Sequence, residues 1–214
     1  MIGWLVFWVT RPDPLPHNVQ RVGNTFHVDV SEGSTDDVVK KNCLFVVPKA
    51  FNPKFSIESF MFNLRLPDGV PLMVNELSEG DEVVWAVVSY IKLPSQGMAA
   101  FELSKVQPKD GGLKNVPFLV ESRNGLDMYQ YDYGKDQLSI GTMYSFVMSS
   151  GTRVLVKDPG KWAADYIVYR KLTDSVELKY LFSKKQVQSL SSFVSDVTRV
   201  DNVVIKTLQS FQSK

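Results

Sequence analysis

The last thirty-two residues, Ser183 to Lys214, contain the one long periodic pattern in the sequence. Apolar residues recur there at alternating intervals of three and four, the a/d spacing of a helical heptad. Ser183, with Gln186 three residues later, matches the capping box that begins a helix. The pattern therefore predicts an amphipathic helix from Ser183 that, if unbroken, would span about 45 Å at about 1.5 Å per residue. The seam positions are Val187, Leu190, Val194, Val197, Asp201, Val204, Leu208 and Phe211.

One carboxylate, Asp201, occupies a position on this apolar seam. We expect residues 184–199 to form a docked helix, because Ser183 follows the last predicted strand without a linker. Asp201 and Asn202 interrupt the seam, and the segment beyond them is compatible with a second helix or with an added strand. The sequence leaves open whether that segment docks in cis or in trans. We predict a contact with a partner through Val203, Val204, Leu208 and Phe211.

Residues 1–182 follow a different pattern, in which short segments of period-two alternation or apolar character are separated by turn residues. The expected fold class is mainly β, an antiparallel sandwich or barrel of about a dozen short strands, followed by a C-terminal α-helix. The domain organisation is therefore a β-rich unit at 1–182 and an amphipathic helix at 183–214, packed on that unit or projecting from it. The expected strands are 19–30 as a hairpin, 43–47, 59–66, 70–74, 82–93, 98–106, 116–120, 126–133, 138–149, 153–158, 164–172 and 176–182.

The segment 82–93 is apolar on both faces at its centre, around Val84, Trp85, Ala86 and Val87. A strand with this pattern is typical of a sheet that is buried on both sides. We therefore expect a cover on each face of the sheet at this point.

The charge balance and cysteine content limit the classes of function. Twenty-four basic and twenty-three acidic residues give a formal net charge of +1, so no global field attracts nucleic acid or an anionic membrane. Cys43 is the single cysteine and no Asn-X-Ser/Thr acceptor occurs, which favours an intracellular location or a particle assembled there. The apolar window 1–10 has about half of the roughly 20 residues that a membrane helix needs, so no transmembrane segment is predicted.

Residues that support catalysis are scarce. The sequence contains two histidines, and Cys43, His27 and Asp29 form the single thiol triad that it can supply. Cys43 lies in an apolar run, where an inert buried thiol is usual. One cysteine and two histidines also fall short of a structural zinc site. We therefore expect a non-enzymatic protein with no metal or cofactor; a polar pocket that gathers His17 or His27 would favour an enzyme.

A tyrosine-bearing strand supports an alternative function. Tyr129, Tyr131 and Tyr133 share one face of a predicted strand, and Lys135 follows them. Aromatic rings beside a cation are the arrangement that stacks bases and pairs with a phosphate. The same tyrosines could equally form the core face of the strand, because the opposite face offers little to bury.

These observations favour a structural or interaction protein over an enzyme. The leading prediction is a self-assembling β protein, by analogy with viral coats or matrix layers, that forms a homo-oligomer through its C-terminal segment. The alternative is a nucleic-acid-binding β domain that uses the tyrosine strand.

Overall fold

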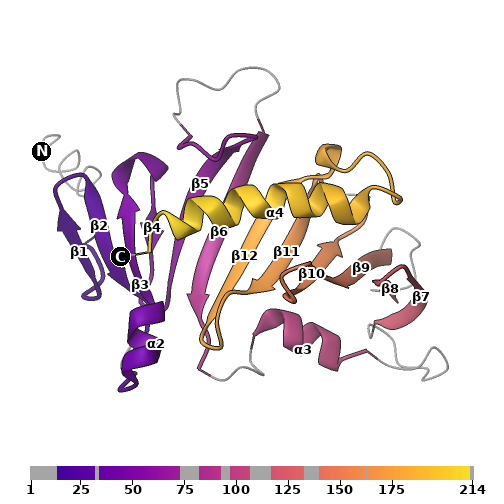
Figure 1. Ribbon diagram of the computed structural model, residues 1–214, viewed down its shortest axis with the longest axis horizontal. Coiled ribbons are helices and arrows are strands. Elements are labelled where there is room, and N and C mark those ends of the chain that lie inside the picture. The colour runs from indigo at the N-terminus through magenta and orange to yellow at the C-terminus, as the bar shows by residue number, and fades with distance from the viewer. Residues whose placement is uncertain are drawn as a thin grey trace, which may run out of the picture.

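The computed structural model describes residues 14–31, 34–72, 82–92, 97–106, 117–132, 140–161 and 163–212. Within these ranges the chain forms two antiparallel sheets, and the larger one is crossed by the C-terminal helix (Figure 1). The three-stranded sheet has the order β1-β2-β3, with bounds Val19–Val22, Thr25–Asp29 and Leu44–Pro48.

The nine-stranded sheet has the order β4-β5-β6-β12-β11-β10-β9-β8-β7 and does not close into a barrel. The prediction of a mainly β fold with about a dozen strands and a C-terminal helix is therefore confirmed, in its open two-sheet form. Its strands are β4 Lys54–Phe55, β5 Ser59–Leu66, β6 Glu82–Tyr90, β7 Phe118–Arg123, β8 Leu126–Asp132, β9 Ile140–Val147, β10 Arg153–Asp158, β11 Asp165–Lys171 and β12 Val176–Ser183.

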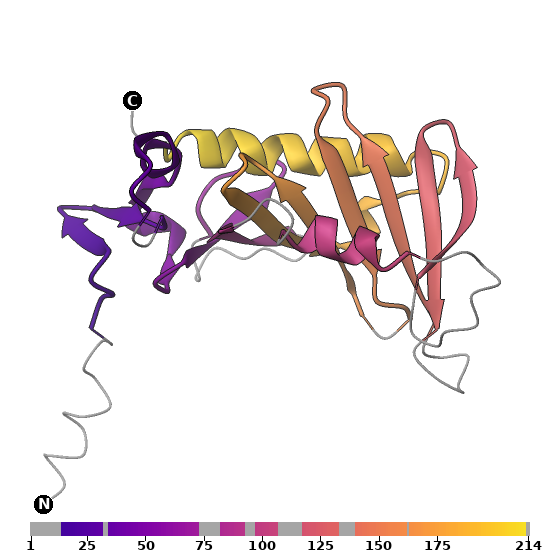
Figure 2. The ribbon, with the colours of Figure 1, turned by 90° about the horizontal axis from the view of Figure 1, so that it is seen from below.

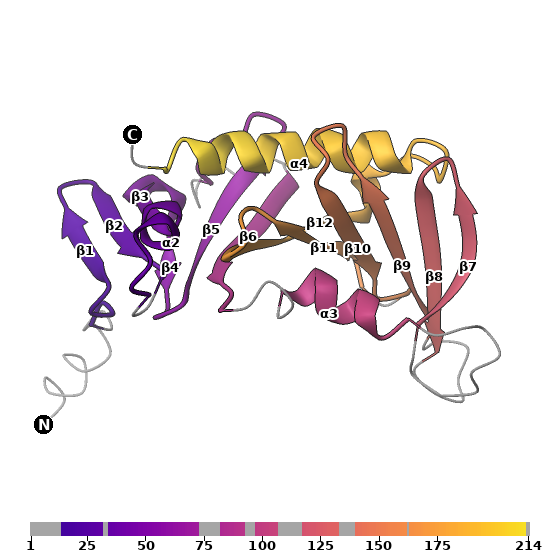
Figure 3. The ribbon, with the colours of Figure 1, turned by 60° about the horizontal axis from the view of Figure 1, so that its bottom comes forward.

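The helices α2, Asp37–Asn42, and α3, Met98–Ser104, are short, whereas α4, Phe193–Gln209, has 17 residues. Two 3-10 turns, at Lys49–Phe51 and Lys184–Gln186, complete the regular elements of the described ranges. Figures 2 and 3 show α4 running along the large sheet, with its C-terminal end toward the small sheet.

The sequence-based expectation for 98–106 was wrong, because this segment forms α3 rather than a strand. Ala99, Leu103 and Val106 recur at helical spacing and pack together against the sheet. The first turn of α3 is held by Glu177 of β12, whose carboxylate accepts hydrogen bonds from the backbone amides of Met98 at 2.8 Å and Ala99 at 3.1 Å. This cap comes from a residue 78 positions or more away in the chain, so no local pattern indicates it.

The C-terminal helix begins later than predicted. Ser183 does cap a 3-10 turn, but residues 187–192 form an irregular segment that ends in a turn, and the helix begins at Phe193. Serine hydroxyls compete for the backbone groups of this segment: Ser189 and Ser192 bond to each other's amides. Asp196 also reaches back to accept from the Gln188 amide at 3.1 Å. The expected docked helix at 184–199 is therefore wrong in its first nine residues, and the helix is about 26 Å long at 1.5 Å per residue.

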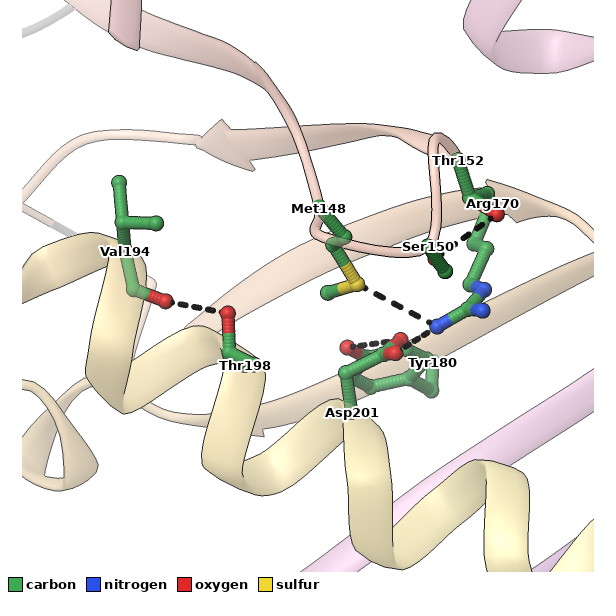
Figure 4. Close-up of polar contacts among 8 residues, drawn as sticks. All are labelled: Met148, Ser150, Thr152, Arg170, Tyr180, Val194, Thr198 and Asp201. Carbon is green, nitrogen blue, oxygen red and sulfur yellow. Dashed lines mark hydrogen bonds and ion pairs between the residues drawn. The ribbon is translucent and has the colours of Figure 1, made fainter. Parts of the chain in front are cut away.

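The helix continues without interruption through Asp201, because this carboxylate has partners on the sheet beneath it (Figure 4). Asp201 is fully buried, accepts a hydrogen bond from the Tyr180 hydroxyl at 3.0 Å and forms an ion pair with the Arg170 guanidinium. Arg170 also donates to the sulfur of Met148 at 3.4 Å. Burial lowers the pKa of Arg170 and raises that of Tyr180. Asp201 therefore holds α4 against the sheet and does not interrupt the helix.

Removing the Asp201 carboxylate should leave the Arg170 side chain, which is 12% exposed, without its anion. We expect Asp201→Ala to lower the free energy of unfolding by about 3 kcal/mol in chemical denaturation. Combining Asp201→Leu with Arg170→Met and Tyr180→Phe should recover most of that loss, because neither a charge nor a buried hydroxyl is then left without a partner. Asp174→Ala, which breaks the exposed pair with Lys171, is the control and should change stability by less than about 1 kcal/mol. Equal effects of the Asp201 and Asp174 variants would contradict this account.

The buried Tyr180 also predicts a loss of stability at high pH. The folded protein keeps this phenol protonated at pH values where the unfolded chain, with the ordinary pKa of 10.0, loses the proton. Above pH 10 the unfolded state therefore binds fewer protons, and the free energy of unfolding falls by up to about 1.4 kcal/mol per pH unit for this group. Tyr180→Phe should make the decline between pH 10 and 12 less steep; an unchanged slope in denaturation measured across that interval would refute the assignment.

Candidate interaction surface

Three of the four residues predicted to contact a partner through the C-terminal segment lie in the core of this chain. Val204 and Phe211 are fully buried, and Leu208 is 3% exposed. The Phe211 ring packs edge-on against Phe51 and Phe62, with ring centroids 4.9 and 5.1 Å apart. The segment therefore docks in cis, because its apolar seam fits the sheet of its own chain.

The fourth residue, Val203, is half-buried beside the turn at Gly69. Gly69 has a φ of +71°, and a Cβ built there would lie 2.6 Å from the Thr207 hydroxyl and 3.0 Å from a Val203 methyl group. The Thr207 hydroxyl donates to the Gly69 carbonyl oxygen at 3.2 Å. The turn at Gly69 therefore covers Val203, and no partner chain is needed to explain its partial burial.

The tyrosine strand is β8, and its first tyrosine is a core residue. Tyr129 is 9% exposed and packs with Met143, Leu155 and Tyr169 beneath α3. Burial raises the pKa of its phenol, with a smaller effect of Asp127. The base-stacking role predicted for Tyr129 is therefore corrected, because α3 covers the ring. Tyr131 follows in the same strand, and Tyr133 and Lys135 lie outside the described residues.

The two histidines line a shared cavity of about 390 Å³ on the small sheet, which is the gathering of His17 and His27 expected to favour an enzyme, although the walls of this cavity are mainly apolar. Asp29, in the same lining, accepts hydrogen bonds from the amide of Ser31 at 2.8 Å and from its hydroxyl at 2.6 Å. Cys43 does not line this cavity and is fully buried, and burial together with Asp29 raises the pKa of its thiol to about 11. The thiol is therefore protonated at neutral pH and separated from the exposed His27. In the described ranges, no three His, Cys, Asp or Glu side chains converge as ligands for a metal ion.

The large sheet has one face covered by α4 and a second face that α3 covers only in part. Toward α4, β6 buries Val84, Ala86 and Val88 completely. On the other side α3 covers the region of β8 to β11, where its cluster with Tyr129 lies. The remaining region, which we call the Trp85 face, consists of Met61 and Asn63 from β5, Val83, Trp85 and Val87 from β6, and Lys179 and Leu181 from β12.

Trp85 stands between the two neighbouring strands of this face. It lies opposite Asn63 on β5 and Leu181 on β12, and 44% of its surface is exposed. The expectation that this strand is covered on both sides is therefore wrong for the described part of the chain. The alternation explains the difference: the even positions of β6 face α4, whereas Val83, Trp85 and Val87 face away from it.

Polar groups surround the apolar centre of the Trp85 face. Asn63 is 8% exposed, and its side-chain oxygen has no hydrogen-bond partner among the described residues. Lys179 is half-buried, with its ammonium 5.9 Å from the centre of the Tyr169 ring. Lys54, opposite Met61 on β4, is exposed. An apolar centre with a polar rim and one large aromatic side chain is the composition of a protein contact surface.

Comparisons with known proteins identify no family. No protein-family model matches the sequence, and no curated protein matches it either. Among solved structures, the chain aligns with the crystal structure of FrpD, an iron-regulated outer membrane lipoprotein of Neisseria meningitidis, with a TM-score of 0.40 and 13% sequence identity. That alignment covers 95% of this chain and 97% of FrpD. Among the described helices, none combines the length and apolarity needed to cross a bilayer.

The position of Tyr129 can be tested by truncation. We expect Tyr129→Ala to lower the free energy of unfolding by about 3 kcal/mol, because it leaves a cavity between β8 and α3. Tyr129→Phe should have a small effect, since the hydroxyl makes only a 3.5 Å contact with Asp127. Chemical denaturation of both variants checks this, and a neutral Tyr129→Ala variant would place the ring outside the core.

Proposed function

We propose that this chain is a non-enzymatic protein that assembles with copies of itself through the Trp85 face. The observation that carries the proposal is Trp85 itself, exposed by 44% in a strand whose sequence is apolar on both sides. Large aromatic residues at the centre of an apolar patch supply much of the binding energy in protein interfaces. The sequence predicted self-assembly through the C-terminal segment, whereas the contact surface proposed here lies on the opposite side of the sheet.

A second copy of the chain suits this surface for two reasons. The face is a twisted antiparallel sheet region, and such faces pack on one another with their side chains interdigitated. The net charge of +1 also gives little overall repulsion between copies. Analogy with viral coats or matrix layers rests on architecture alone and stays a prediction, as does an intracellular location.

Single-stranded nucleic acid is a second candidate ligand for the same face. Trp85 is exposed, and Lys54 and Lys179 lie on the two strands next to β5 and β6. An aromatic ring with flanking cations can stack a base and contact its phosphate. This alternative replaces the site at Tyr129, and it predicts a salt-dependent shift of a labelled oligonucleotide that Trp85→Ala abolishes.

The assembly proposal is tested by light scattering coupled to size exclusion over a range of protein concentrations. We expect the wild type to associate and Trp85→Ala to weaken its self-association at least tenfold, because a central aromatic anchor is lost. Leu190→Ala is the control, since Leu190 is 55% exposed just before α4, on the opposite side of the sheet from Trp85. A wild type that stays monomeric throughout, or association that survives Trp85→Ala, would overturn the proposal.

A further inference from the structure

We propose that the groove between α2 and α3 binds an amphiphilic anion, a molecule with an apolar chain and a carboxylate or similar acidic head. This site is separate from the Trp85 face and does not depend on self-assembly. The groove encloses about 900 Å³, within the range of small-molecule sites. It lies where the β9–β10 and β11–β12 turns meet the two helices.

The walls of the groove suit an apolar chain. Val39 and Leu172 are half-buried there, and Ile91 is 9% exposed. Val38, on the α2 side, has 70% of its surface exposed. On the α3 side the lining is made of Gly97, Ala99 and Ala100, whose small side chains leave room for a ligand beside the helix.

Two cations lie next to each other at the sheet end of the groove. Val154 of β10 pairs with Arg170 of β11, so the next residues along these strands, Arg153 and Lys171, are neighbours. Like charges on adjacent strands are unfavourable unless an anion lies between them. Both cations have weak partners: Lys171 pairs with Asp174, which is 85% exposed, and Arg153 lies 3.9 Å from Asp127.

Three carboxylates line the groove, and each has a partner within the protein, Asp174 through its ion pair with Lys171. Asp36 accepts from the amides of Val38 and Val39 at the start of α2. Glu177, opposite Lys171, accepts from two amides at the start of α3. The Arg153 guanidinium donates to the Ser145 hydroxyl at 3.0 Å, and of its five N–H donors this is the one bonded to a side chain among the described residues. The groove therefore offers N–H donors of Arg153 to an anionic head group, next to an apolar wall for the chain of the ligand.

Decanoate is the probe, with decanol as the probe without charge and acetate as the probe without a chain. In calorimetric titrations below the micelle concentration, wild type should bind decanoate more tightly than decanol and should not bind acetate. Arg153→Gln should weaken decanoate binding about tenfold and leave decanol unchanged, because one charge-assisted contact is lost. Lys171→Gln provides the same comparison if Arg153→Gln proves unstable. Ala100→Leu, which fills the groove, should weaken both ligands.

Arg21→Gln, on the exposed strand β1, is the matched control and should bind decanoate like the wild type. The proposal is overturned if wild type does not bind decanoate, if Arg153→Gln and Lys171→Gln bind it unchanged, or if Trp85→Ala abolishes the binding. The last result would place the ligand on the Trp85 face.

Discussion

The contact between Asp201 and the side chains of Arg170 and Tyr180 fixes the relation of the C-terminal helix to the large sheet. A carboxylate with no surface exposure is costly unless it is paired and hydrogen-bonded, and the sheet supplies both partners. The observed placement of α4 satisfies this requirement and also buries Val197, Val204 and Leu208 on the same side. Because α4 covers that face, the Trp85 face on the other side stays available for the self-association that we propose.

Much of the β architecture follows from local pattern. The hairpin within residues 19–30, which turns at Gly23 and Asn24, and the strand at 59–66 were predicted from the sequence and are confirmed. In β5, Phe60 and Phe62 are buried, as period-two alternation requires.

The errors arise where distant residues decide the outcome. Glu177, which caps α3, and the partners of Asp201 are remote in sequence from the residues that they stabilise. Local patterns therefore predicted a strand at 98–106 and an interruption of the C-terminal helix at Asp201. The serine-rich run before Phe193 was the local signal for the late start of α4. The sequence left Tyr129 open as a base-stacking residue or a core residue, and it is a core residue because α3, which was expected to be a strand, covers it. The apolar outer face of β6 was recognised, whereas Trp85 was not singled out as a contact residue.

Solvent accessibility of the Trp85 indole at low and high protein concentration tests the account most directly. In NMR spectra the indole N–H resonance, identified by its loss in Trp85→Phe, should be broadened by a soluble paramagnetic agent when the protein is dilute. At concentrations where the protein associates, that resonance should be protected while the amides of α4 are unaffected. A Trp85 resonance that is broadened equally in the dilute and the associated protein would contradict the assignment of this face as the contact surface.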